Sequence, residues 1–309
     1  MRVLFMGTPD FAAESLEAII GADHEVCAVF TQPDKPVGRK RILTAPPVKD
    51  TAIKHNIPVF QPESVRNQEV VEQIKTLAPD VCVVVAYGKL LPDEILSIAP
   101  FGCINVHASL LPKYRGASPI QWAIVCGEKK TGVSTMLLDS GMDTGDVLLT
   151  AEEPIFDDDT AETLWDRLST LGASLILKTL KACADGTITR TPQNHDIATY
   201  APIIKKEDGL LDFNKSAYVA DCLVRGLHNW PVAYIYADGK RLKIFSAKPF
   251  NKVCNKGEIL SQENSLILGF ADNTALEIFE LQMEGAKRMS AADFLRGRKV
   301  SVIEGVQYV

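Results

Sequence analysis

The sequence has no long hydrophobic run and no closely spaced cysteine pair. Its first residues, MRVLFMGTPDF, hold one basic residue and a few apolar positions, which is too short for a secretion signal or a membrane span. The nearest two of its seven cysteines, Cys82 and Cys103, are 21 positions apart, so the CxxC spacing of zinc and redox sites does not occur. We therefore expect a cytoplasmic protein that does not enter a membrane, with reduced cysteines and no metal.

Two common nucleotide-binding motifs are also absent. The first predicted strand, RVLFMG, is followed by TPDF, which lacks the GxGxxG spacing of a dinucleotide-binding turn. The P-loop pattern GxxxxGK[ST] has no match in the chain. These absences argue against a dinucleotide cofactor and against a P-loop nucleotide site.

The composition is that of a folded protein with two domains. The chain has 309 residues, of which 46% are hydrophobic and 23% charged, as in ordinary globular proteins. The net charge of −6 is unevenly spread: residues 205–309 carry 15 Lys and Arg against 13 Asp and Glu, and residues 1–204 carry 18 against 26. The C-terminal part is therefore the less acidic one, which suits local contacts with phosphate groups.

The order of hydrophobic patterns predicts a mostly parallel sheet followed by a smaller antiparallel domain. The apolar runs RVLFMG, EVCAVFT, DVCVVVAY and CINVH come with helical patterns such as FAAESLEAIIGA, as in a doubly wound α/β fold with helices on both faces. GVSTMLLD and DVLLTAEEPIF predict two further strands, and residues 160–186 predict a long helix. From residue 232 onward, short alternating runs between DGK, NKG and ADN turns predict a small β-barrel of the OB type.

A segment without periodicity separates the two predicted domains. Residues 186–208 mix Pro, Thr, Asn and charged residues without a sustained period, which is typical of a linker. We therefore place the first domain at residues 1–189, the linker at 190–207 and the second domain at 208–309.

The densest group of polar and turn-forming residues is NVHASLLPKYRGASP, at residues 105–119. It follows a predicted strand of the parallel sheet, where open α/β sheets bind ligands. Asn105 and His107 lie two apart on an extended segment, so their side chains leave one face and can donate hydrogen bonds to one atom. Acyl transfer to an amine needs such donors at the developing oxyanion, together with a group that takes the amine proton.

A carboxylate that orients the His107 ring would complete this set. Asp143 lies in the turn-rich segment LLDSGMDTGD after the next long strand, with Asp139 and Asp146 as nearby competitors. Taken singly, an acid in such a segment is usually a turn or cap residue. The combination of an acid with Asn105 and His107 indicates catalysis.

Two segments carry a specific resemblance. NVHASLLPKYRGASPIQWAI followed by GVSTMLLDSGMDTGDVL resembles the signature of the folate-dependent formyltransferases. The resemblance implies 10-formyltetrahydrofolate as formyl donor and the catalytic residues Asn105, His107 and Asp143. It also implies that AYGKLLP and LLDSGMD form a pterin slot beside SLLP. The residues expected to contact the folate are Ser109, Leu110, Leu111, Pro112, Tyr87, Gly88, Leu90, Leu138 and Asp139.

The predicted slot suits a pterin, because a flat, amide-rich ring needs backbone donors and acceptors between apolar walls. An ordinary strand-to-helix turn is the alternative interpretation of AYGKLLP.

Three further features resemble the family members that formylate methionyl-initiator tRNA. They are the opening RVLFMGTPDFAAESLEAI, the basic loop DKPVGRKRILTAPPVKDTA and the C-terminal barrel. The resemblance implies charged initiator methionyl-tRNA as the formyl acceptor. The loop suits phosphate contacts at an RNA end, although a solvated surface loop is the alternative. Its cations are Lys35, Arg39, Lys40 and Arg41.

Two other functions stay open at this level. One keeps the fold and the donor but formylates a sugar nucleotide, and the basic loop argues against it. The other is a non-catalytic module that binds RNA or folate. Our expectation is direct attack of the amine on the formyl carbon, by a monomeric enzyme without a metal.

Overall fold

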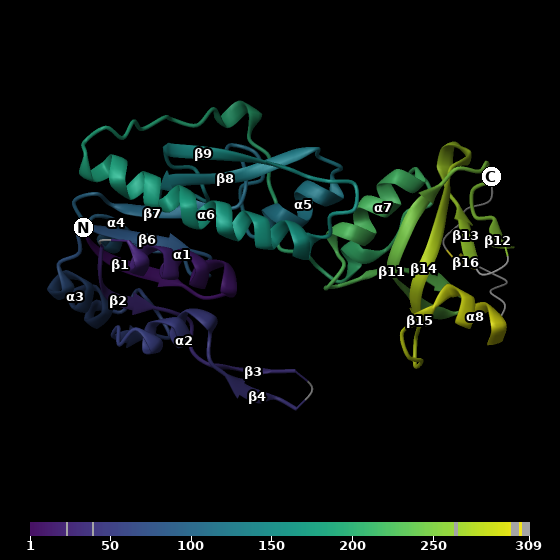
Figure 1. Cartoon of the computed structure of the whole chain (residues 1–309), viewed down its shortest axis with the longest axis horizontal. Helices are drawn as coiled ribbons and strands as arrows, with labels where there is room; N and C mark the ends of the chain where they lie inside the picture. The colour runs from purple at the N-terminus through teal and green to yellow at the C-terminus, as the bar shows by residue number, and fades with distance from the viewer. Residues whose placement is uncertain (23, 39, 263–264, 298–302, 305–309) are drawn as a thin grey trace. The chain divides into compact units, whose positions relative to one another are not determined.

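The chain forms two compact units, and Figure 1 shows their helices and strands coloured by residue number. The structure is a computed structural model that describes residues 1–22, 24–38, 40–262, 265–297 and 303–304. Unit 1 consists of residues 1–119, 130–154 and 165–201. Unit 2 consists of residues 120–129, 155–164 and 202–309. The domain limits given above stay a prediction.

Unit 1 is built on a seven-stranded sheet in the order β5-β2-β1-β6-β7-β8-β9. The first five strands in this order are parallel and mostly buried, as strands covered by helices require. They are β1 (Arg2–Gly7), β2 (Glu25–Phe30), β5 (Val59–Phe60), β6 (Val81–Val85) and β7 (Cys103–His107). The last two pair antiparallel and are β8 (Lys130–Leu137) and β9 (Val147–Pro154).

Helices cover both faces of this sheet (Figure 1). On one face, the rings of Phe11 and Trp165 meet edge to face at 5.2 Å and join α1 (Asp10–Gly21) to α6 (Ala161–Ala184). On the other face, α3 (Gln68–Leu77) and α4 (Asp93–Leu96) pack on the apolar side chains of β1 and β6. The helix α2 (Pro47–Lys54) packs beside α1, and α5 (Pro119–Val125) follows the polar segment 105–118.

The strand order places the predicted site segments at one edge of the sheet. The order reverses between β1 and β6, where open α/β sheets bind ligands beyond the carboxyl ends of the strands. The hydroxyl of Thr8, just after β1, donates to the carbonyl of Tyr87, just after β6, at 3.1 Å. The segment that follows His107 leaves β7 at the same edge, because β6 and β7 are parallel.

Unit 2 is built on antiparallel strands in the order β12-β13-β14-β11-β10-β16, with β15 beside β14. Its core contains fully buried aliphatic residues, including Leu242, Ile244 and Ile278, against which α7 (Ala217–Gly226) and α8 (Ala291–Gly297) pack. The strands are β10 (Ala233–Ala237), β11 (Lys240–Phe250), β12 (Ile259–Gln262), β13 (Ser265–Gly269), β14 (Ala275–Met283), β15 (Met289–Ser290) and β16 (Ile303–Glu304). The predicted fold class, a mostly parallel sheet followed by an antiparallel domain, is confirmed.

Two segments that the sequence patterns describe as loops have regular backbone pairing. The basic loop forms a hairpin of β3 (Lys35–Val37) and β4 (Ile42–Thr44). The segment before residue 202 contains the short turn η1 (His195–Ile197), and η2 (Glu207–Gly209) follows it within unit 2. Up to residue 201 the segment belongs to unit 1, where Thr191 pairs with Val147 at the start of β9 and Tyr200 pairs with Arg115. Within the described ranges, none of the helices has the length and hydropathy of a membrane span.

The central position of β7 predicts a large stability difference between two isoleucines. Ile104 of β7 is 0% exposed and Ile53 of α2 is 57% exposed. Ile104→Ala should lower the free energy of unfolding by about 2–5 kcal/mol, and Ile53→Ala should change it by no more than about 0.5 kcal/mol. Urea unfolding of both variants checks this, and equal effects would contradict the placement of β7 in the core.

Candidate active site

The strand β7 presents Asn105 and His107 on one face of the sheet. Alternate residues of a strand point to opposite faces, so these two share a face with Cys103, which packs in the core beneath α4. Asn105 and His107 are 9% and 6% exposed. Two polar side chains are therefore held almost out of water at the carboxyl end of a central strand.

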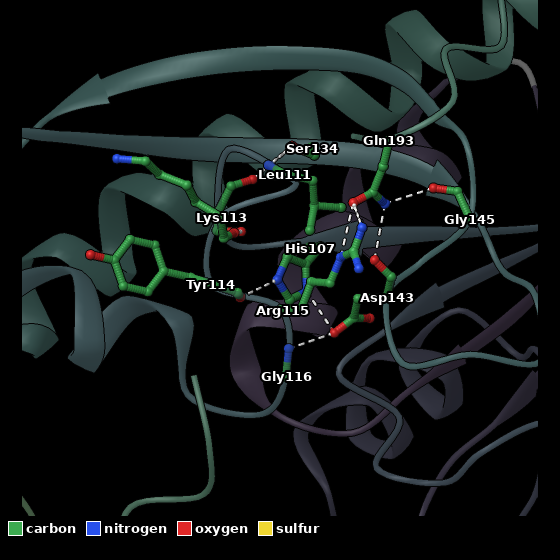
Figure 2. A network of polar contacts seen from close by, with 11 residues as sticks. His107, Leu111, Lys113, Tyr114, Arg115, Gly116, Ser134, Asp143, Gly145 and Gln193 are labelled. Atoms are coloured by element: carbon green, nitrogen blue, oxygen red, sulfur yellow. Dashed lines mark hydrogen bonds and ion pairs between the residues drawn. The ribbon is translucent and has the colours of Figure 1, made fainter. Parts of the chain in front are cut away.

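The ring of His107 lies between two oxygen acceptors (Figure 2). Its Nε2 is 2.9 Å from the carbonyl oxygen of Tyr114, and its Nδ1 is 3.7 Å from Oδ2 of Asp143. An imidazolium carries a proton on both nitrogens and can donate in both directions. To donate to a substrate oxygen, His107 has to exchange one of these two acceptors for it.

Asp143 is the acid that the structure brings to His107. It lies in the loop between β8 and β9 with a left-handed backbone, φ 52°, and its Oδ2 accepts a 2.7 Å hydrogen bond from the amide of Gly116. Asp139 instead stabilises its own loop by accepting from the Gly141 amide and the Thr144 hydroxyl. Asp146 is linked to β8 through its carbonyl, which accepts from the Leu137 amide.

The predicted folate segment, residues 109–112, is fixed to β8. Ser109 is fully buried, and its hydroxyl donates to the Lys113 carbonyl at 2.6 Å. The Ser134 hydroxyl donates to the Ser109 carbonyl at 2.7 Å and accepts from the Leu111 amide at 3.1 Å. Ser109 therefore stabilises this turn. The other three residues of the segment are half-buried and form its accessible surface; they are Leu110, Leu111 and Pro112.

The turn after β6 buries Tyr87 and exposes Leu90. The Tyr87 ring is 1% exposed in the core beneath α4, and burial raises the pKa of its hydroxyl to about 12. The Tyr87 carbonyl accepts from Thr8 and from Nε2 of Gln32, at 3.1 and 3.0 Å. Gly88 has φ 80°, which turns the chain so that Leu90 is 65% exposed. Any contact of Tyr87 with a ligand would thus be through its backbone, whereas Leu90 presents its side chain.

The β3–β4 hairpin carries exposed cations on a fixed base. Both carboxylate oxygens of Asp34 are 2.8 Å from Nζ of Lys49, and Nε2 of Gln61 donates to Oδ1 at 2.7 Å. The bonds from Gln61 and Lys49 lower the pKa of Asp34, so this anchor is present at neutral pH and weakens as pH falls through that pKa. The exposed cations of the hairpin are Lys35, Lys40 and Arg41; the predicted Arg39 lies outside the described residues.

Two residues near Asp143 have no role in the sequence interpretation. Arg115 lies within the polar segment 105–119 but is 1% exposed, and it donates to the side-chain oxygen of Gln193. Gln193 in turn donates to the carbonyls of Asp143 and Gly145. Gln193 comes from the predicted linker, and no pattern in the sequence marks it.

The chemistry available here is stabilisation of negative charge beside an oriented imidazole. Asn105 and His107 supply donors, Asp143 balances a protonated ring, and burial strengthens each of these interactions. Among the residues that the structure describes, no three His, Cys, Asp or Glu side chains gather in a way that could hold a metal ion.

Both parts of the chain are similar to known protein families. Residues 1–180 match the family model described as formyl transferase, and residues 203–299 match the model of the formyl transferase C-terminal domain. The chain therefore belongs to the formyl transferase family.

Methionyl-tRNA formyltransferases are similar to it along nearly the whole chain. The one from Koribacter versatilis is 49% identical over 298 residues and that from Acetivibrio thermocellus 48% over 303, with 96% and 97% of both chains covered. Among solved structures, an N-formyltransferase from Helicobacter canadensis has a TM-score of 0.68 at 18% identity, covering 92% of this chain and 99% of its own. HypX from Aquifex aeolicus has a TM-score of 0.62 at 19% identity, covering 100% and 50%. These two structures share the fold.

The packing of the Asp143 loop predicts that a methyl group at Gly145 lowers activity. A Cβ there would lie 1.9 Å from the carbonyl oxygen of Leu137. Gly145→Ala should therefore displace the loop and lower kcat for formyl transfer by about 10²-fold, the effect of a misplacement near 1 Å. Gly21→Ala is the control, since nothing lies within 4 Å of its added Cβ. Equal rates for the two variants would contradict the role given to this loop.

Proposed function

We propose that this enzyme transfers the formyl group of 10-formyltetrahydrofolate to the free amine of methionyl-initiator tRNA, giving N-formylmethionyl-tRNA for translation initiation. The observation that carries the proposal is the similarity to methionyl-tRNA formyltransferases, at 47–49% identity over 96–97% of the chain. It includes both the catalytic and the C-terminal parts of the family, so the acceptor as well as the donor chemistry is supported.

The folate donor is supported by the fold and by the surface at the sheet edge. The Helicobacter canadensis enzyme is in complex with folinic acid, and HypX with tetrahydrofolic acid. In this chain, the half-buried Leu110, Leu111 and Pro112 and the exposed Leu90 offer apolar walls. The turn at Gly88 and the residues Leu138–Asp139 are the proposed sources of backbone groups for the pterin, which needs both; the Leu138 amide itself donates to the Cys103 carbonyl.

The reaction is direct acyl transfer. The neutral methionyl amine attacks the formyl carbon, its C–N bond forms, and the bond from that carbon to N10 of the folate breaks. Asn105 and His107 donate hydrogen bonds to the oxyanion, while Asp143 orients the His107 ring and balances its charge. The amine loses one proton and N10 gains one, with Asp143 helping to relay it, so tetrahydrofolate leaves neutral at this nitrogen.

We assign binding of the tRNA acceptor to the basic hairpin and to the C-terminal domain, residues 208–309. Lys35, Lys40 and Arg41 are exposed on the hairpin, together with the apolar Ile42 and Leu43, at 63% and 66%. Cations position RNA phosphates, and apolar side chains can lie against unstacked bases. The sugar formyltransferases among the similar structures are 18–19% identical to this chain, and they support the fold rather than a sugar acceptor. A monomeric state, a cytoplasmic location and the absence of a metal stay predictions.

The proposed chemistry predicts large losses from small changes at three positions. Asn105→Ala, His107→Ala and Asp143→Asn should each lower kcat by about 10²–10³-fold, because each removes a group that acts on the transition state. Folate binding should survive, since none of the three lies among the proposed pterin contacts. The measurement is conversion of charged methionyl-initiator tRNA to its formylated form, with thermal unfolding to verify the fold.

Asp146→Asn is the matched control, because it makes the same chemical change as Asp143→Asn. The bond that links Asp146 to β8 uses its backbone carbonyl, which the substitution does not alter. The Asp146→Asn variant should keep kcat within about two-fold, as expected where no catalytic group is altered. Near-parental rates in all three active-site variants would overturn the assignment. Formylation of a UDP-amino sugar in preference to the charged tRNA would overturn the proposed acceptor.

The hairpin predicts a change in the salt dependence of tRNA binding. Replacing Lys40 and Arg41 by Gln should raise KM for the charged tRNA and reduce the slope of log affinity against log salt, by roughly one for each phosphate that is no longer neutralised. Lys75→Gln with Lys181→Gln is the control, since both are exposed on helices and pair with a nearby acid. If the parent and the hairpin variant bound the tRNA with the same affinity and the same salt dependence, the hairpin would be a solvated surface loop without a role in tRNA binding.

A further inference from the structure

Residues 187–201 of unit 1 are tied to both loops of the candidate active site. Thr191 and Val147 exchange two backbone hydrogen bonds of 2.9 Å, which join the segment to β9 just after the Asp143 loop. Further on, the Arg115 amide donates to the Thr199 carbonyl at 2.9 Å, and the Ala201 amide donates to the Arg115 carbonyl at 2.7 Å. The segment therefore joins the loop that holds Asp143 to the loop that follows His107.

Gln193 is the buried side chain between these two attachments. It is 8% exposed, and its Nε2 donates to the Asp143 carbonyl at 2.9 Å and to the Gly145 carbonyl at 2.7 Å. Its Oε1 accepts from Nε and Nη2 of Arg115, at 3.1 and 2.7 Å (Figure 2). A carboxamide has two N–H donors and two acceptor lone pairs, and all four are used here.

Arg115 fixes the direction of the Gln193 amide. A guanidinium can only donate, so the oxygen of Gln193 must face it and the nitrogen must face the Asp143 loop. Arg115 is 1% exposed, and its side-chain partners in the described chain are the Gln193 amide and the His195 ring, whose Nδ1 is 3.2 Å from Nη1. Burying a cation whose side-chain partners are an amide and an imidazole ring costs folding free energy. This cost favours a role for Arg115 in the site.

Asp143 needs this support. Its φ of 52° lies in the left-handed region, which costs free energy in a residue other than glycine unless the surroundings hold it. Gln193 holds the carbonyl of Asp143, and the Gly116 amide holds the Oδ2 atom that lies 3.7 Å from His107 Nδ1. The direction of the carboxylate therefore depends on contacts at both ends of the residue.

We propose that Gln193, oriented by Arg115, is a positioning residue that holds the Asp143 carboxylate toward His107. Residues 187–201 are thus part of the active site and serve as more than a connection between domains. The inference rests on the proposed function only for its effect on rate; its effect on the Asp143 loop is independent of the substrate.

Gln193→Glu is the sharpest test. It keeps the shape of the side chain and a partner for Arg115, but it places an oxygen against the two carbonyls that now accept N–H bonds. It should lower kcat by about 10–100-fold, as displaced supporting groups do, with KM for both substrates unchanged. Asn194→Asp is the matched control, because it makes the same chemical change at the exposed neighbouring residue and keeps the acceptor for the Asp196 amide.

A double-mutant cycle separates positioning from general destabilisation. If Gln193 acts through Asp143, adding Gln193→Glu to the Asp143→Asn variant should lower kcat by less than about two-fold. If the two residues act independently, the full loss of the single variant should appear again. A full additional loss in that background would overturn the proposal. Gln193→Ala, which adds no charge, should give the same pattern and serves if the Glu variant does not fold.

Hydrogen exchange of the free protein tests the positioning role of Gln193 even if the tRNA is not the acceptor. Amides of residues 138–146 and of Gly116 should exchange faster in Gln193→Glu and Gln193→Ala than in the parent and in Asn194→Asp. Unchanged exchange would overturn the proposal, whatever the activity. A parent enzyme that leaves charged initiator tRNA unformylated would instead overturn the proposed function, while the exchange result would still stand.

Discussion

The approach of the Asp143 carboxylate to the His107 ring is the interaction on which the rest of the site depends. His107 comes from the central strand β7, whose position the sheet fixes, whereas Asp143 comes from a loop with an unfavourable backbone conformation. The distance of 3.7 Å between them is therefore decided by what holds the loop. The Gly116 amide, the Gln193 amide and the Asp139 carboxylate together provide that support.

The same principle of a fixed base and a presented surface holds elsewhere in unit 1. Ser134 and Ser109 fix the segment at residues 109–112, whose two leucines are half-buried, and the buried Tyr87 ring belongs to the turn that exposes Leu90. Asp34 fixes the base of the hairpin that carries the cations. Hydrogen-bonded polar groups and a buried ring set the geometry of these segments, and the more exposed side chains are the proposed substrate contacts.

The sequence predicts those parts of the structure that depend on local pattern. The apolar runs predict β1, β2, β6 and β7, and the spacing of Asn105 and His107 places them on one face, because strand periodicity decides both. Local pattern alone could not separate Asp143 from Asp139 and Asp146, because the choice depends on how the loop folds back to Gly116; the resemblance to the family is what indicated Asp143. Gln193 and Arg115 could not be predicted for a similar reason: their contacts join residues 48–80 positions apart, and the aperiodic segment around Gln193 has no pattern that indicates them.

The central claim is that this enzyme moves an intact formyl group from folate nitrogen to the amine of methionyl-tRNA. The most direct measurement is a single turnover with 10-formyltetrahydrofolate labelled with ¹³C in the formyl carbon and charged initiator tRNA in excess. The account predicts that the label appears as the formamide carbon of N-formylmethionyl-tRNA, in step with the loss of the donor. Label recovered as free formate, or donor consumed at the same rate without the tRNA, would contradict it.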